Sequence, residues 1–93
     1  MITVYILFSE KFLKTYVGYT TNINERIKYH NNGKVLSTKY FRPWKIIYTE
    51  SAVSIILAKQ KERYWKSGAG RRNLKRILGG FPPNFKVRRG SPK

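Results

Sequence analysis

The sequence predicts an α+β domain in which a small three-stranded antiparallel sheet is flanked by helices, in the order β-β-α-β-α-α. Two runs rich in β-branched and aromatic residues, 2–8 and 15–20, are joined by a short polar stretch, as in an antiparallel hairpin. Helical patterns lie on either side of a third such run, 44–49, which starts directly after Pro43. The 93 residues suffice for one hydrophobic core and are too few for two.

The first half of the chain gives clear local signals. Residues 2–8 form a continuous apolar run, which suits a central strand or one covered on both faces. Gly18 lies inside the second run and marks a bulge or a close backbone approach. Asn22 and Glu25 form a capping box, so a helix is expected to start there and to end near Gly33, which can take the left-handed conformation.

The second half is less regular. Residues 34–43 show no period and are predicted to be an ordered basic loop. A helical pattern runs from 51 to 66 and is broken at Gly68 and Gly70. Residues 71–78 then form a short, very basic third helix.

Charge is the strongest compositional feature. Lys and Arg total 20 against four Glu and no Asp, a formal net charge of +16. Such a chain concentrates on a polyanion by releasing counterions from phosphates. A surface charged only for solubility and an anionic membrane as partner are weaker alternatives, because the basic residues recur throughout a folded sequence.

The domain is predicted to span 1–79, followed by a basic tail at 80–93 that contains proline and glycine and is extended or disordered. The absence of cysteine excludes disulfides, thiolate nucleophiles and thiolate zinc sites. The N-terminal apolar run is too short and wrongly flanked for a signal peptide or a membrane span, so a cytoplasmic location is expected.

Two polar side chains share the apolar face of the first helix. A rotation of about 100° per residue places Ile23, Arg26, Ile27 and His30 in one stripe. The histidine is either a satisfied semi-buried side chain or a catalytic group, and the arginine either extends to the rim or serves the site.

An acid is also out of place on the second helix. Glu62 falls on the helical wheel among three apolar residues: Ile55, Ala58 and Trp65. Since a buried carboxylate needs a partner, Glu62 either pairs with Arg26 or Lys66 or binds a hard cation such as Mg²⁺. In a protein that binds a polyanion, an inward acid weakens binding unless a metal screens it, which favours the metal.

Tyr5 and Tyr16 lie on the two paired strands, where their side chains can reach one pocket, although strand tyrosines are usually packing residues. With Thr3-Val4-Tyr5, Tyr16-Val17-Gly18, Arg26, His30 and Glu62 in this order and spacing, the chain closely resembles the GIY-YIG endonuclease superfamily. The likeness covers about residues 2–78. It is strongest to compact stand-alone bacterial members, which are similar to the N-terminal nuclease domain of the repair excinuclease. Thr3 replaces a glycine, and two valines replace isoleucines.

The resemblance implies the GIY-YIG fold and a role for each site residue. Glu62 would hold one Mg²⁺ or Mn²⁺ ion that acts as a Lewis acid. Arg26 would bind the scissile phosphate and stabilise its developing charge. Tyr5 would be the general base or would position the attacking water, with help from Arg26 and the metal. Tyr16 would orient water or phosphate, and His30 would relay a proton or act as an orienting donor.

Further residues follow from the same likeness. Gly18 would give backbone clearance beside the site. Asn73 is the nearest candidate for an asparagine that some members use, although a surface role is the stronger alternative. Seven basic residues would contact phosphates without reading sequence: Lys34, Lys39, Arg42, Arg71, Arg72, Lys75 and Arg76.

The sequence therefore predicts a metal-dependent endonuclease acting on DNA, in repair or recombination of structured DNA. The alternative is a non-catalytic basic nucleic-acid-binding module that retains the nuclease fold. A third possibility is that a protein partner supplies specificity, since many members are cleavage modules attached to targeting domains. The residues do not distinguish DNA from RNA or define an oligomeric state.

Overall fold

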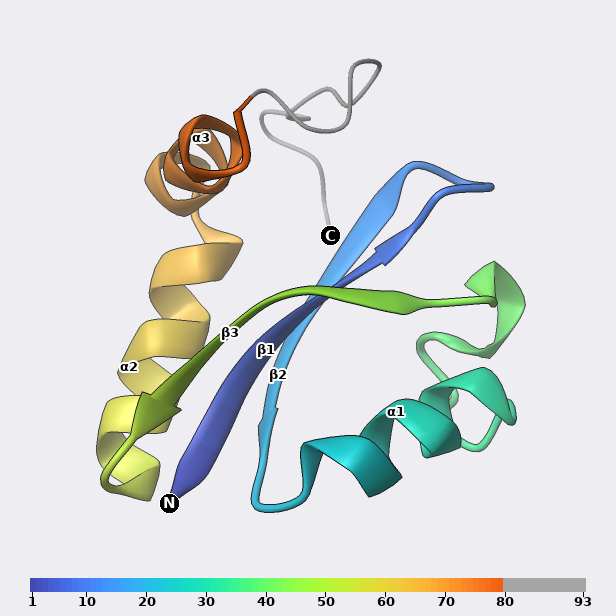
Figure 1. The fold of residues 1–93 in the computed structure, drawn as a ribbon, viewed down its shortest axis with the longest axis horizontal. Helices are drawn as coiled ribbons and strands as arrows, with labels where there is room; N and C mark the ends of the chain where they lie inside the picture. The colour runs from blue at the N-terminus through green and yellow to red at the C-terminus, as the bar shows by residue number, and fades with distance from the viewer. Residues whose placement is uncertain (80–93) are drawn as a thin grey trace.

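The computed structural model describes residues 1–79 and confirms the α+β fold (Figure 1). The sheet has the antiparallel order β2-β1-β3. The predicted tail lies outside the described residues. The elements are β1 (Ile2–Ser9), β2 (Lys14–Thr20), α1 (Ile23–Asn31), the 3-10 helix η1 (Lys39–Phe41), β3 (Lys45–Ala52), α2 (Ile55–Lys66) and α3 (Gly68–Ile77).

Strand β1 is the central strand, and both its faces are covered, which explains its continuous apolar sequence. Val4 and Ile6 pack in a cluster with residues of α2 and α3. Tyr5 and Leu7 pack on the other face with residues of α1 and with Trp44. Figure 1 shows α2 and α3 on one side of the sheet and α1 with η1 on the other.

Helix α1 forms as its sequence predicts. The Asn22 side chain accepts a hydrogen bond from the Glu25 backbone N–H at 3.2 Å, and Gly33 after the helix has a φ of +77°. His30 is buried, and the other three residues of the predicted stripe are half-buried, whereas the intervening positions are exposed. The helix therefore directs Arg26 and His30 towards the sheet.

The boundary between β3 and α2 differs from the expected one. The strand continues to Ala52, which pairs with Ile2 of β1, instead of ending at residue 49. The helix begins at Ile55, since the Ser54 hydroxyl accepts a hydrogen bond from the Leu57 backbone N–H at 3.2 Å and caps it. The prediction that Ile55 lies on the buried face was wrong, because its first-turn position leaves it 46% exposed.

Helix α3 starts three residues earlier than predicted. Ser67 caps it by accepting from the Gly70 backbone N–H at 3.1 Å, so Gly68 and Gly70 belong to the helix and do not break it. A Cβ at Gly70 would lie 2.1 Å from the Tyr64 carbonyl oxygen. The missing side chain thus lets α3 pack against the end of α2.

A second acid, Glu50 on β3, fixes α2 to the sheet. It accepts hydrogen bonds from the Tyr48 hydroxyl and the Trp65 indole N–H, both at 3.0 Å, and Lys61 lies 3.5 Å away. Burial and the Glu50 carboxylate raise the pKa of Tyr48. Glu50 therefore has structural partners that satisfy its charge.

Among residues 1–79 there is no helix with the length and apolar character needed to cross a membrane.

Candidate active site

The Tyr5 side chain lies across the neighbouring strand β2 at Gly18. It lies opposite Gly18 in the β1–β2 register, and a Cβ at Gly18 would lie 2.6 Å from the Tyr5 hydroxyl oxygen. Of the two predicted roles of Gly18, the structure shows the close approach; the irregularity in pairing falls instead between β1 and β3, at Ile6 and Leu7. The glycine thus lets the Tyr5 hydroxyl extend over β2, although the residue is only 1% exposed.

Tyr5, Tyr16 and His30 form one aromatic cluster on the α1 side of the sheet. The ring centroids of Tyr5 and Tyr16 are 6.5 Å apart, and the His30 ring lies 5.8 Å from Tyr5 and 5.0 Å from Tyr16. Trp44 borders the cluster, with its ring 6.4 Å from that of Tyr16. The two strand tyrosines and the helix histidine therefore meet, as the sequence suggests.

A line of hydrogen bonds runs through this cluster. The Tyr5 hydroxyl lies 2.9 Å from Nε2 of His30, and Nδ1 of the same ring lies 2.8 Å from the Thr38 hydroxyl. The Thr38 hydroxyl in turn lies 3.3 Å from the Val35 carbonyl oxygen, to which it donates. His30 and Thr38 are both fully buried. Both ring nitrogens thus have partners inside the protein.

Burial also determines the charge of His30. Desolvation, assisted by the positive charge of Arg26, lowers the pKa of the imidazole from 6.5 to about 4. The ring is therefore neutral at physiological pH, with one of its two nitrogens unprotonated.

Charged groups of α1 and α2 both affect the pKa of the Tyr5 hydroxyl. Burial raises the pKa of Tyr5, and the nearby Tyr16 and Glu62 raise it further, whereas a hydrogen-bonding and charge interaction with Arg26 opposes the rise. The net effect keeps the pKa above its usual value, so the free protein holds Tyr5 as a neutral phenol.

Arg26 and Glu62 come from opposite sides of the sheet. Both α1 and α2 contact the edge strand β2, over which the Tyr5 hydroxyl extends. The Glu62 side chain is 24% exposed and forms an ion pair with Lys66 at 3.1 Å, one of the two partners expected from the sequence. The described part of the chain contains no group of three or more His, Cys, Asp or Glu side chains that could hold a metal.

The two strand tyrosines meet His30 beside Gly18, and the charges of Arg26 and Glu62 affect the pKa of Tyr5. The family model of the GIY-YIG catalytic domain matches residues 1–75. The chain belongs to the GIY-YIG family. It is thereby placed in a nuclease family, whose members generally use divalent metal ions.

Relatives of this GIY-YIG domain include two curated UPF0213 proteins. YazA of Bacillus subtilis is 42% identical over 52 residues, covering 55% of this chain and 52% of YazA. A UPF0213 protein of Bacillus licheniformis is 41% identical over 66 residues, covering 68% of this chain and 65% of the relative. The chain thus spans about half to two thirds of the length of these relatives. The solution NMR structure of the UPF0213 protein BH0048 from Bacillus halodurans is 32% identical, with coverage of 89% and 90% and a TM-score of 0.49.

The seven basic residues predicted to contact phosphates fall into two groups that the fold keeps apart. Lys34, Lys39 and Arg42 belong to the loop between α1 and β3, and the other four belong to α3 on the opposite side of the sheet. The Arg42 Nε donates to the Lys39 carbonyl at 2.6 Å, which holds this part of the loop in place.

Asn73 has a local role in α3. Its side-chain amide donates to the Tyr64 hydroxyl at 3.1 Å and accepts from Arg76 at 2.6 Å. These contacts tie α3 to α2 and fit the surface role considered from the sequence.

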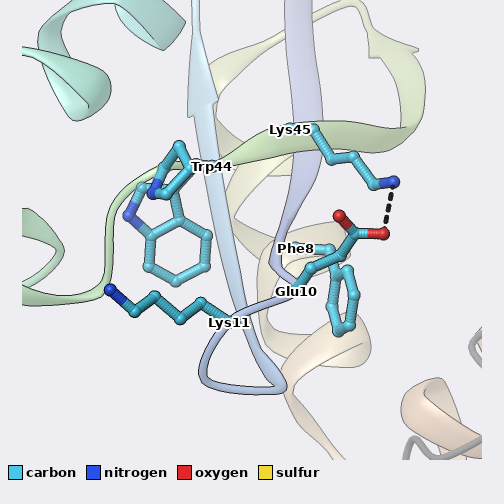
Figure 2. A pocket seen from close by; sticks show the side chains of 6 residues that line it. Phe8, Glu10, Lys11, Trp44 and Lys45 are labelled. Atoms are coloured by element: carbon cyan, nitrogen blue, oxygen red, sulfur yellow. Dashed lines mark hydrogen bonds and ion pairs between the residues drawn. The ribbon is translucent and has the colours of Figure 1, made fainter.

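An open pocket lies at the hairpin end of the sheet and does not include the tyrosine cluster. Figure 2 shows the ion pair between Glu10 and Lys45, 3.1 Å long, beside it. Its volume is about 460 Å³, and its lining residues are Phe8, Glu10, Lys11, Pro43, Trp44 and Lys45. Trp44 connects it to the cluster, through Tyr16.

Sequence reasoning missed the residues that support His30. The Trp44 indole N–H donates to the Thr38 carbonyl at 2.9 Å, and the Asn31 side chain binds the backbone N–H and C=O of Trp44 at 2.7 and 3.0 Å. The aperiodic loop offers no pattern that singles out Thr38. Asn31 could have been suspected of supporting His30 only from its position, directly after His30 in the last turn of α1.

Proposed function

We propose that this GIY-YIG domain is a divalent-metal-dependent endonuclease that hydrolyses phosphodiester bonds in DNA, in the repair or recombination of structured DNA. The observation that carries the proposal is the surroundings of the Tyr5 hydroxyl. It has a neutral histidine at 2.9 Å, and its pKa responds both to Arg26 from one helix and to Glu62 from another. A base, a cation and an acid around one hydroxyl suit phosphodiester hydrolysis.

Glu62 is the residue that would hold the metal. It offers a half-buried carboxylate with the hard oxygen ligands that Mg²⁺ and Mn²⁺ prefer. One protein carboxylate is sufficient because Mg²⁺ keeps several waters and takes further oxygens from substrate phosphate. When bound, the ion would supply Lewis-acid polarisation of the scissile phosphate.

The chain's own residues supply proton transfer and charge. The attacking water gives its proton to the Tyr5 oxygen while Tyr5 passes its own proton to Nε2 of His30. This exchange does not require a phenolate, which suits the raised pKa of Tyr5. Arg26 binds the scissile phosphate and stabilises the charge that develops on it. Tyr16, which is half-buried beside His30, orients the water or the phosphate.

The two basic groups supply affinity. They flank the site on opposite sides of the sheet, and a net charge of +16 favours a long polyanion over a small substrate. Phosphate contacts of this kind position a nucleic acid without reading its sequence. RNA is therefore included in the test as a competing substrate.

The decisive experiment measures cleavage of linear, nicked, flap and branched DNA and of RNA, with Mg²⁺, with Mn²⁺ and with chelator. Glu62→Ala should abolish cleavage and retain DNA binding, because the many Lys and Arg side chains that bind DNA are unchanged. Glu25→Ala, an exposed acid of α1, is the matched control since it removes the same charge. Should the wild type and Glu62→Ala bind alike while neither cuts any substrate, the enzyme proposal fails.

One observation favours the non-catalytic alternative. Glu62 already has a partner in Lys66, so the acid does not require a metal to be satisfied. A binding module would show wild-type DNA affinity that does not change with Mg²⁺ or chelator at constant ionic strength. Specificity supplied by a protein partner would appear as cleavage that depends on that partner.

A further inference from the structure

We propose that Thr38 is a positioning residue for this site: its hydroxyl holds His30 in the tautomer that carries the proton on Nδ1 and leaves Nε2 free to accept from Tyr5. The assignment of a tautomer stands on hydrogen-bond geometry alone. Its consequence for catalysis rests on the proposed nuclease function.

The donor direction is set at the Thr38 end by a carbonyl. The Val35 carbonyl can only accept: it accepts from the Thr38 backbone N–H at 3.1 Å, and the Thr38 hydroxyl donates its single proton to the same oxygen at 3.3 Å. The Thr38 oxygen must then accept from its other neighbour, Nδ1 of His30 at 2.8 Å. Nδ1 therefore carries the ring proton.

The same direction follows independently from the Tyr5 end. Tyr5 is buried, and within residues 1–79 the acceptor that its hydroxyl reaches is Nε2 of His30. The phenol proton therefore donates to Nε2 of His30 at 2.9 Å. Because a neutral imidazole has one donor and one acceptor nitrogen, the two ends agree on one tautomer.

Thr38 is held in position by its own surroundings. Its carbonyl accepts from the Trp44 indole, and the backbone of Trp44 is bound on both sides by Asn31, the residue after His30. The threonine, the tryptophan and the end of α1 therefore form a closed set of contacts. No buried side-chain polar atom within residues 1–79 lacks a hydrogen-bond partner.

The functional consequence concerns proton transfer. With the proton on Nε2, His30 would donate to Tyr5 and could not accept its proton, so the transfer from water through Tyr5 would stop. Thr38 would act only through His30 and would not touch the substrate. It lies one residue before Lys39 in the basic loop, so the loop that would contact phosphate also fixes the base.

The test uses ¹⁵N NMR of protein labelled in histidine, which gives a single imidazole because the chain contains one histidine. In the wild type, Nδ1 should show the shift of a protonated ring nitrogen and Nε2 that of an unprotonated one. Thr38→Val removes the acceptor and keeps the shape. The tautomer should then change to Nε2–H in more than about half of the molecules, since a buried N–H without an acceptor is unfavourable.

Two matched variants complete the measurement. Thr38→Ser keeps the hydroxyl and should retain the wild-type tautomer, and Thr21→Val makes the same change at an exposed threonine. A wild-type protein with the proton on Nε2 overturns the proposal, as does a folded Thr38→Val protein with the wild-type tautomer. If Thr38→Val does not fold, Thr38→Ala and the wild-type spectrum decide in the same way.

Activity provides a separate readout. Thr38→Val should lower turnover at saturating DNA by on the order of a hundredfold, at the low end of what a positioned proton-transfer group contributes, with little change in DNA affinity. Thr38→Ser should restore turnover. Equal losses in Thr38→Val and Thr38→Ser would contradict the positioning role. If the wild type cuts nothing, the proposed function fails while the tautomer result still stands.

Discussion

Acidification should destabilise this protein through its single histidine. The folded state binds a proton at His30 with a pKa of about 4, whereas the ordinary value in an unfolded chain is 6.5. Between these values the unfolded chain binds a proton that the folded chain does not, so stability falls as the pH is lowered from about 6.5 to 4. The interval corresponds to a loss of about 3 kcal/mol in the free energy of unfolding by pH 4. That is a large share of the roughly 5–10 kcal/mol expected for a domain of this size.

The assay is urea unfolding across this pH range, for the wild type and for His30→Gln, which cannot titrate at this position. The four glutamates are common to both proteins, so the difference between the two stability curves isolates the histidine. That difference should change by about 3 kcal/mol between pH 7 and pH 4, to the disadvantage of the wild type. An imidazole that titrates near pH 6.5 in the folded protein, together with parallel stability curves, would refute the burial argument.

Three further outcomes are expected. Gly18→Ala should lower the free energy of unfolding in urea by about 1–3 kcal/mol, because the new methyl group meets the Tyr5 hydroxyl. Gly68→Ala is the control: the nearest atom to its new methyl group is 3.4 Å away, so the urea midpoint should stay unchanged or rise. Arg26→Ala should reduce DNA cleavage at saturating substrate by on the order of a hundredfold and affinity by much less; equal losses would indicate a structural role. Asn31→Ala should cost about 2 kcal/mol of stability in thermal or urea unfolding, because it leaves the backbone N–H and C=O of Trp44 without partners, and an unchanged midpoint would show that water replaces them.

Periodicity was sufficient to predict the parts of the site that lie on regular elements. The 3.6-residue repeat of α1 predicted that Arg26 and His30 lie on the face that packs on the sheet, and strand pairing predicted that Tyr5 and Tyr16 can reach one pocket. The structure joins His30 to Tyr5 by a hydrogen bond. The helical repeat also singled out Glu62, whose ion pair with Lys66 is one of the alternatives considered from the sequence.

The remaining features depend on tertiary contacts that have no local pattern. Thr38 lies in an aperiodic loop. Its hydrogen-bond partner is His30, eight residues earlier at the end of α1, and no local sequence pattern indicates this contact. No sequence pattern singles out Glu50, because its partner Trp65 comes from α2. Gly70 was predicted to break a helix. The structure shows instead that the packing of α3 on α2 excludes a side chain at this position, and this packing cannot be seen in the sequence. The role of each of these residues depends on a residue that is its neighbour in the fold but not in the sequence.

The division of the site between the two sides of the sheet has a consequence for protein synthesis. The relay from Tyr5 to Thr38 is encoded before β3, whereas Glu62 lies on a helix that follows the whole sheet in the chain. The proposed metal ligand is therefore the last of these groups to be synthesised. In the proposed mechanism, nuclease activity begins only after α2 has docked on the sheet, one face of which it also covers.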